Sequence, residues 1–165
     1  MFNLGVLVCK VVSKISKLFG HEGSVIGGSY AFKVDKDILK KVKYPKYIIG
    51  VTGSNGKTTT TSIIYEIMKR AFGDKVVLAG NIGTPLCHYV KNIKSGDYLV
   101  MEISDHQLCD MYDFKTNTSI ITNIYECHTD FHDSHERYVM TKKKIFNHHT
   151  KDDTAIINMD NKEVM

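Results

Sequence analysis

Apolar residues recur along the chain at two spacings, which predict two kinds of element. Short runs rich in β-branched and aromatic residues predict strands at 47–52, 76–78, 98–103, 119–123 and 155–158. Apolar positions three or four residues apart predict helices at 4–19, 58–72, 85–93 and 135–148, and an acidic cap opens a short helix at 35–42. Strands that alternate with helices favour a parallel sheet, because parallel neighbours need crossover connections. The pattern therefore predicts an α/β fold with a doubly wound, mostly parallel sheet.

The segment before the first strand predicts an amphipathic helix. Its apolar face consists of Leu4, Leu7, Val8, Val11, Ile15 and Leu18, and its basic face of Lys10, Lys14 and Lys17. Packing of the apolar face on the core is the preferred interpretation, and contact with a membrane surface or a partner helix is the alternative. The lysines interrupt the apolar run, so we expect no membrane span and no secretory signal.

Length and composition fit one ordered domain with an appendage. With 165 residues and 42% hydrophobic content, we expect a domain over 47–165 preceded by a helical lead-in over 1–46. The net charge of +4 is mild and gives no indication of nucleic-acid binding. The cysteines form no C-x-x-C pair, and we expect reduced thiols in a cytoplasmic protein: Cys9, Cys87, Cys109 and Cys127.

A glycine-rich loop lies where the first strand gives way to a helix. Residues 50–60 are Gly-Val-Thr-Gly-Ser-Asn-Gly-Lys-Thr-Thr-Thr. Glycines allow backbone N–H groups to converge on a polyphosphate, the lysine neutralises phosphate charge and the next hydroxyl can bind Mg²⁺. This segment predicts ATP and Mg²⁺ as ligands, with the nucleotide held by Gly53, Ser54, Asn55, Gly56, Lys57, Thr58 and Thr59.

Polar motifs follow the later strands. Asn81 lies in Gly-Asn-Ile-Gly-Thr-Pro at 80–85, and Glu102 ends the third strand in Met-Glu-Ile-Ser-Asp-His-Gln-Leu at 101–108. A carboxylate at a strand end suits a Mg²⁺ ligand, whereas Asn81 alone indicates only a structural turn. His128, His132 and His135, with Asp130 and Asp133, suggest a zinc site, which we rank below magnesium because a phosphate-bridging ion prefers oxygen ligands.

Taken in order, these segments resemble the nucleotide-binding core of the Mur ligases, ATP-dependent enzymes that form the amide bonds of the bacterial cell-wall peptide. The loop, with Val51 where the common phosphate loop has glycine, is similar to that family's variant. The resemblance covers 47–160 and implies phosphate transfer from ATP to a substrate carboxylate, followed by attack of an amine on the acyl phosphate. The motifs are most like those of members that add D-glutamate to UDP-N-acetylmuramoyl-L-alanine.

The resemblance also assigns roles to individual residues. Segment 122–130, Thr-Asn-Ile-Tyr-Glu-Cys-His-Thr-Asp, and segment 138–146, Tyr-Val-Met-Thr-Lys-Lys-Lys-Ile-Phe, match two further family motifs. It implies catalytic roles for Lys57, Asn81, His128 and Lys142, metal ligation by Thr58, Glu102, His128 and a carbamylated Lys142, and substrate contacts from Asn81, Ser104 and Gln107. From the residues alone, Lys142 also fits a solvated basic run. Asp105 and His106 stand where the family motif has Ser and Phe.

Two alternatives stay open. The lead-in is too short for the usual UDP-binding domain and resembles the start of the Mur-like subunit of lipid II isoglutaminyl synthase, which works with a glutamine amidotransferase subunit. The substrate is then a lipid-linked muropeptide instead of a UDP-muramoyl peptide. The other alternative is a non-catalytic nucleotide-binding module, because we expect the domain to be truncated on its C-terminal side.

Overall fold

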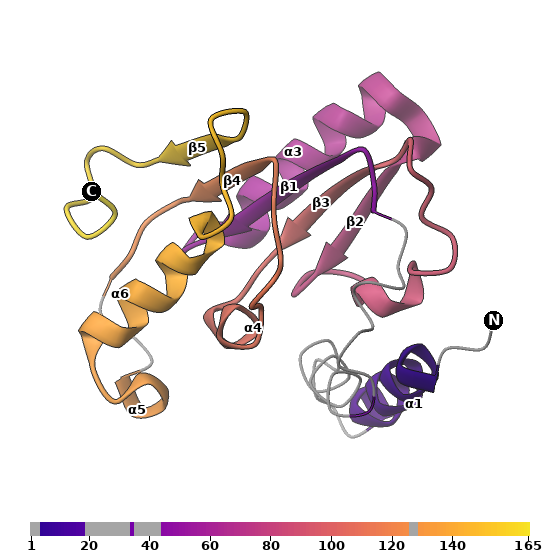
Figure 1. Cartoon of the computed structure of the whole chain (residues 1–165), viewed down its shortest axis with the longest axis horizontal. Coiled ribbons are helices and arrows are strands. Elements are labelled where there is room, and N and C mark those ends of the chain that lie inside the picture. The colour runs from indigo at the N-terminus through magenta and orange to yellow at the C-terminus, as the bar shows by residue number, and fades with distance from the viewer. Residues whose placement is uncertain (1–3, 19–33, 35–43, 126–128) are drawn as a thin grey trace.

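Five parallel strands form the centre of the molecule (Figure 1). The computed structural model describes residues 4–18, 34, 44–125 and 129–165. The strands are β1 (Tyr47–Thr52), β2 (Val76–Gly80), β3 (Tyr98–Glu102), β4 (Thr118–Ile121) and β5 (Thr154–Ile157). They lie in the order β2-β3-β1-β4-β5, and every pairing is parallel. The predicted parallel α/β sheet is confirmed.

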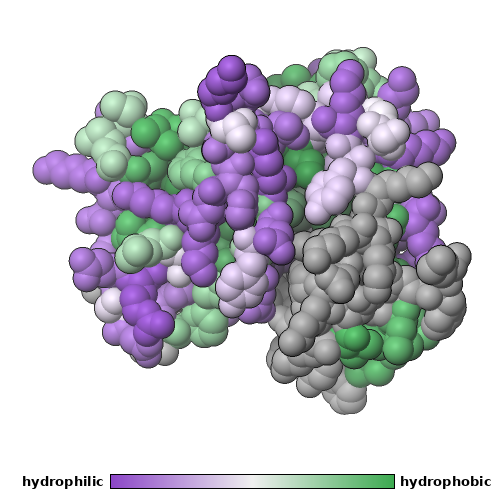
Figure 2. All heavy atoms as spheres, in the orientation of Figure 1, coloured by the Kyte–Doolittle hydropathy of each residue, from purple (hydrophilic) through white to green (hydrophobic). Residues whose placement is uncertain are grey.

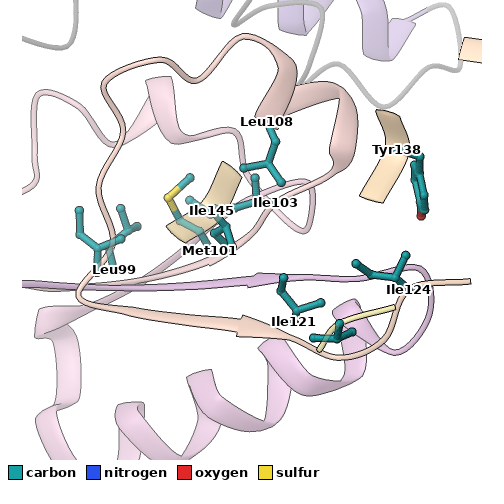
Figure 3. Packing of buried hydrophobic residues seen from close by; sticks show 11 residues of the cluster. Leu99, Met101, Ile103, Leu108, Ile121, Ile124, Tyr138 and Ile145 are labelled. Carbon is teal, nitrogen blue, oxygen red and sulfur yellow. The ribbon is translucent and has the colours of Figure 1, made fainter. Parts of the chain in front are cut away.

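Helices cover both faces of this sheet (Figures 1 and 3). One face carries α3 (Lys57–Phe72), and the other carries α4 (Asp105–Cys109), α6 (His135–Lys143) and the 3₁₀ turn η4 (Lys144–Phe146). The remaining short elements are η2 (Gly73–Lys75), η3 (Leu86–His88) and α5 (Thr129–His132). β1 pairs with β3 on one side and β4 on the other, so the order in which strands are added to the sheet reverses beside β1. At such a point α/β folds open a crevice at the carboxyl ends of the strands.

Strand β3 anchors the core. Its burial leaves only the first residue partly exposed, which is typical of a parallel strand covered on both faces. Leu99 and Met101 pack against Leu108 and Ile145 in the cluster beneath α4 and η4 (Figure 3). This packing holds the end of β3, and therefore Glu102, in a fixed position.

Two helix predictions were wrong in extent. The segment predicted as a helix over 85–93 contains only η3, because the N–H groups of His88, Tyr89 and Asn92 each bond to a carbonyl three residues back. The helix predicted over 135–148 is α6 followed by the tighter turn η4. The short helix predicted over 35–42 lies outside the described residues.

The amphipathic helix α1 (Leu4–Leu18) exists, but the face predicted to pack on the core was wrong. Buried instead are Val6, Cys9 and Ser13, whereas Leu4, Leu7, Val11 and Ile15 are exposed. The buried face is narrower and smaller, and it packs near η3, where Val6 and Cys9 form a cluster with Cys87 and Val90. The larger apolar side chains therefore point away from the domain.

The prediction of reduced thiols was also wrong for two cysteines. Cys9 of α1 and Cys87 of η3 form a disulfide with their Cα atoms 6.3 Å apart, although 78 residues separate them in sequence. Tertiary packing brings the two cysteines together, and their spacing in the sequence gives no sign of this pairing. Cys109 is a free thiol, and Cys127 lies outside the described residues.

Within the part of the chain that the structure describes, no helix is both long and apolar enough to cross a lipid bilayer.

Candidate functional site

The glycine loop connects the end of β1 to the start of α3 in a conformation that requires glycine. Gly53 has φ +146° and Gly56 has φ +76°. A Cβ on Gly53 would overlap Thr122 Oγ1 and lie 3.0 Å from the Asn123 carbonyl oxygen, whereas a Cβ on Gly56 would meet no atom within 4 Å. The loop is therefore pressed against the segment that follows β4 at Gly53 and open to solvent at Gly56.

The Thr-Asn pair after β4 holds this loop in place. The Ser54 N–H donates to the Asn123 carbonyl at 2.8 Å, and the Asn55 N–H donates to Asn123 Oδ1 at 2.9 Å. In return, Thr122 Oγ1 donates to the Asn55 carbonyl at 2.7 Å. Helix α3 then begins at Lys57 with no side chain capping its first turn, so the positive end of a 16-residue helix faces the loop.

Three predicted site residues meet at the carboxyl edge of the sheet. The buried Glu102 carboxylate accepts a hydrogen bond from Thr58 Oγ1 at 2.8 Å and another from Asn81 Nδ2 at 3.1 Å. The Asn81 N–H also donates to the Glu102 carbonyl at 2.8 Å, so β2 and β3 end in register. Lys57 Nζ donates to the Ser54 carbonyl at 2.9 Å, which keeps its charge over the loop.

The oxygens of this cluster fit Mg²⁺. A hydroxyl and a carboxylate at the mouth of a phosphate loop are hard ligands of the kind this ion takes, with phosphate oxygens completing the coordination. Thr58 and Glu102 already lie within hydrogen-bonding distance of each other. These two side chains are therefore the ones that would hold the ion.

Ser104 and Gln107 form the start of α4. Ser104 Oγ accepts from the Gln107 N–H at 3.2 Å, and Gln107 Oε1 accepts from the Ser104 N–H at 2.9 Å, which together make a capping box. Their predicted substrate contacts stay a prediction. In the structure both side chains stabilise the turn of the chain that follows Glu102.

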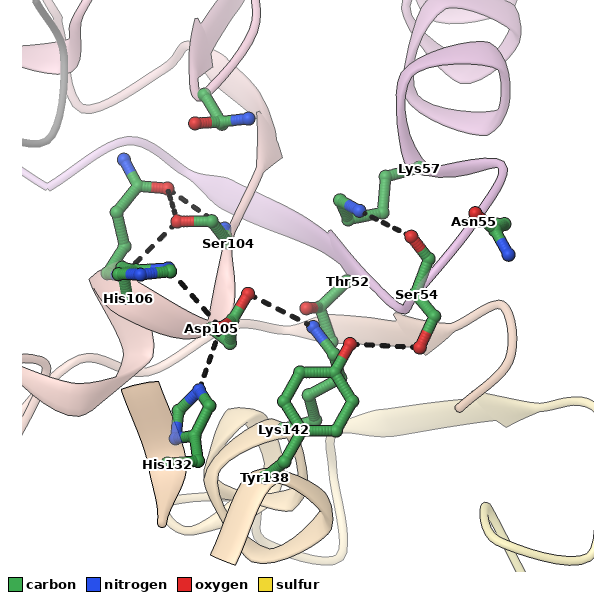
Figure 4. A network of polar contacts seen from close by, with 12 residues as sticks. Thr52, Ser54, Asn55, Lys57, Ser104, Asp105, His106, His132, Tyr138 and Lys142 are labelled. Atoms are coloured by element: carbon green, nitrogen blue, oxygen red, sulfur yellow. Dashed lines mark hydrogen bonds and ion pairs between the residues drawn. The ribbon is translucent and has the colours of Figure 1, made fainter. Parts of the chain in front are cut away.

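Asp105 is the buried centre of an ionic cluster formed by residues of α4, α5 and α6 (Figure 4). Its carboxylate lies 2.8 Å from His132 Nε2, 3.3 Å from His106 Nδ1 and 3.6 Å from Lys142 Nζ. Burial acts to raise the pKa of Asp105, but the hydrogen bond from His132 and the charge of Lys142 outweigh it and lower that pKa below its usual value. Asp105 is therefore ionised at neutral pH, and its negative charge lies beside the Lys142 ammonium.

Tyr138 connects this cluster to the phosphate loop. Its hydroxyl lies 2.9 Å from Ser54 Oγ, and Lys142 Nζ lies 4.7 Å from the centre of its ring (Figure 4). Lys142 itself is completely buried, so the solvated basic run does not include it. Helix α6 thus contacts the loop through one residue and the ionic cluster through another, one turn apart.

Comparison with known proteins decides the family. Residues 51–165 match the family model described as the Mur ligase middle domain. This chain belongs to the Mur ligase family.

Similar proteins include two UDP-N-acetylmuramoylalanine–D-glutamate ligases. That of Geobacillus sp. (strain WCH70) is 45% identical over 118 residues, which are 71% of this chain and 26% of that protein. That of Clostridium acetobutylicum is 43% identical over 129 residues, 78% of this chain and 28% of that protein. The chain thus spans about a quarter of the length of these relatives.

Solved structures of Mur ligases share the fold. MurF ligase from Thermotoga maritima in complex with ADP superposes with a TM-score of 0.57 at 26% identity, covering 78% of this chain and 31% of that one. MurF from Acinetobacter baumannii gives a TM-score of 0.56 at 20% identity, covering 72% of this chain and 27% of that one. The P-loop-containing α/β sheet is therefore that of a Mur ligase central domain.

The Mur-ligase motifs hold two residues whose contacts the sequence did not indicate. Asn123 supports the phosphate loop and Tyr138 contacts it, although both lie in motifs noted for other residues. His128 lies outside the described residues, so its metal role stays a prediction. Across the described ranges no group of three or more His, Cys, Asp or Glu residues could hold a metal ion, and His132 instead pairs with Asp105.

Proposed function

We propose that this chain is the nucleotide-binding part of an ATP-dependent ligase that adds D-glutamate to UDP-N-acetylmuramoyl-L-alanine. The relatives that carry this activity in their names support it, and because the chain spans about a quarter of their length, the complete activity is a proposal. The observation that carries the nucleotide site is the pair of hydrogen bonds from Thr58 and Asn81 to Glu102, at the mouth of a glycine loop.

Each group of the site has a distinct task in this proposal. The N-terminal N–H groups of α3 and the Lys57 ammonium bind the phosphates and neutralise their charge. Thr58 and Glu102 would hold Mg²⁺, which would neutralise negative charge on the phosphates. Asn81, whose Nδ2 donates to Glu102 at 3.1 Å, would contact the substrate carboxylate from the mouth of the loop. Catalysis then rests mainly on positioning and charge neutralisation.

Lys142 takes part only after chemical change. As an ammonium it repels a metal cation, so a ligand role requires the ammonium to lose a proton and the resulting amine to add CO₂ and lose a second proton, which gives an anionic carbamate. Asp105 Oδ1 lies 3.6 Å from Lys142 Nζ, so an anionic oxygen is already present at this position. A metal ligand in addition to Thr58 and Glu102 would therefore come from the ionic cluster beside the phosphate loop.

Nucleotide titrations test the proposal. ATP binding, measured calorimetrically with and without Mg²⁺, should tighten with the ion in the unmodified chain. Lys57→Ala should weaken binding at least about tenfold through loss of charge-assisted hydrogen bonds. Lys69→Ala is the matched control, because Lys69 lies on the same helix and pairs with Asp74 on the surface. Glu102→Gln should abolish the Mg²⁺ effect while leaving Mg²⁺-free affinity unchanged.

An ADP-release assay tests the substrate. Release that requires both UDP-N-acetylmuramoyl-L-alanine and D-glutamate supports the proposal. Tight ATP binding without release under any combination of the two would show that this part of the enzyme binds nucleotide but does not complete the reaction alone. Release driven by a lipid-linked muropeptide and ammonia instead would identify the amidating branch of the family.

A further inference from the structure

The helix α1 presents an apolar stripe to solvent. Leu4, Leu7, Val11 and Ile15 are 55%, 42%, 47% and 49% exposed, and their spacing of three and four residues places them on one side of the helix. Figure 2 shows the corresponding hydrophobic patch at the lower right, where Figure 1 places α1. Single exposed apolar residues are ordinary, but a contiguous stripe indicates an interaction surface.

The orientation of this stripe is fixed by the opposite side of the helix. Val6, Cys9 and Ser13 are buried against the domain, and Cys9 is joined covalently to Cys87 in η3. Turning the stripe inward would expose these three residues and would be resisted by the disulfide. The packing and the disulfide therefore keep the apolar stripe exposed on the surface.

The charge of the helix indicates what the stripe contacts. The segment Leu4–Leu18 contains no acidic residue, and Lys14, next to Leu7 and Val11 on the helix surface, is exposed. Lys10 lies between the stripe and the buried face. A second copy of this helix offers no acidic side chain to pair with these lysines. The matching surface is one that is apolar and carries negative charge beside its apolar layer.

We propose that α1 binds the surface of a bilayer containing anionic lipids, with the stripe inserted among the acyl chains and the lysines at the headgroups. An amphipathic helix with basic residues on its polar side lies in this interface. Its affinity adds the burial of four apolar side chains to the attraction of each lysine for anionic headgroups. This inference is independent of the nucleotide site.

Vesicle sedimentation tests this inference with the whole chain. We expect binding to mixed phosphatidylglycerol–phosphatidylcholine vesicles and much weaker binding to pure phosphatidylcholine. Val11→Asp should weaken binding more than about tenfold, because it places a charge in the inserted stripe. Lys14→Ala should weaken it about fivefold and reduce its salt dependence.

Two matched variants on α3 control for general effects. Ile67→Asp introduces the same charge at a residue that is 63% exposed, and Lys69→Ala removes the same charge from the chain. Both should bind vesicles as the unmodified chain does, and circular dichroism should show equal helix content in all five proteins. Absence of vesicle binding by the unmodified chain overturns the inference. So does an equal loss in Val11→Asp and Ile67→Asp, or a dimer in solution that Val11→Asp dissociates while vesicle binding is absent.

Discussion

Replacing each of the two loop glycines with alanine should have unequal effects, because only one of them lacks space for a side chain. Gly56→Ala requires only that a non-glycine residue adopt φ +76°, which costs about 1–2 kcal/mol. Gly53→Ala also requires a positive φ, and in addition its Cβ would overlap Thr122 Oγ1 and lie 3.0 Å from the Asn123 carbonyl oxygen. Overpacking costs a further 1–3 kcal/mol, so we expect a total loss of about 2–5 kcal/mol.

Urea unfolding followed by circular dichroism measures this difference. Removing the overlapping oxygen provides an internal check: Thr122→Ala alone should lose about 1 kcal/mol, because Thr122 Oγ1 donates to the Asn55 carbonyl. The double variant Gly53→Ala/Thr122→Ala should then be more stable than the sum of the single losses predicts. Equal losses in Gly53→Ala and Gly56→Ala, or strict additivity in the double variant, would refute the reasoning that the loop is pressed against the segment after β4.

Three further predictions concern α4 and α6. Ser104→Ala should lower the free energy of unfolding by about 1 kcal/mol through loss of the capping box, measured by urea titration, and an unchanged midpoint would contradict it. Asp105→Asn should reduce the loss of folding stability at acid pH. The lowered pKa of Asp105 stabilises the folded state above the unfolded pKa of about 3.9, and this stabilisation is lost as the pH falls through the folded pKa. Thermal melts from pH 5 to pH 2 measure this, and parallel curves would exclude it. Lys142 should carry a carbamate in bicarbonate-rich buffer, which a ¹³C resonance would detect. Its occupancy should be higher in Asp105→Ser, because the carboxylate that would repel the carbamate is removed. Absence of the resonance in both proteins would refute the modification.

Strands were easier to predict from this sequence than helix packing. The strands are short runs rich in apolar residues, and in β3 burial on both faces makes the run itself the signal. The four residues of β5 are exposed, so there the run alone located the strand. Helical periodicity located α1 and α3 equally well. Periodicity identifies an apolar face, however, and not the surface that covers it. In α1 the domain accepts the narrow side of Val6 and Ser13, and the larger residues stay outside.

The candidate site was predictable as far as it depends on strand ends. Glu102 ends β3 and Asn81 follows β2, whereas Lys57 and Thr58 begin α3 after the loop that follows β1. Parallel strands bring such residues to one edge. The bracing of the loop by Asn123 could not be read in this way, because it depends on the register between β1 and β4. Residues that hold a site through backbone contacts carry no chemical signature of their own.

The ionic cluster shows how one substitution within a motif changes what its neighbours can do. A serine at position 105, the first residue of α4, would leave the buried Lys142 without this carboxylate, and a carbamate on Lys142 would then supply the negative charge. Asp105 provides that charge at neutral pH, and its side chain is 7% exposed and paired with His132. A carbamate on Lys142 would place a second anion beside the first in a buried site, which is unfavourable unless a cation lies between them. Modification of Lys142 and metal binding should therefore be coupled in this chain: Mg²⁺ and nucleotide together should raise carbamate occupancy, and Asp105→Ser should weaken that dependence.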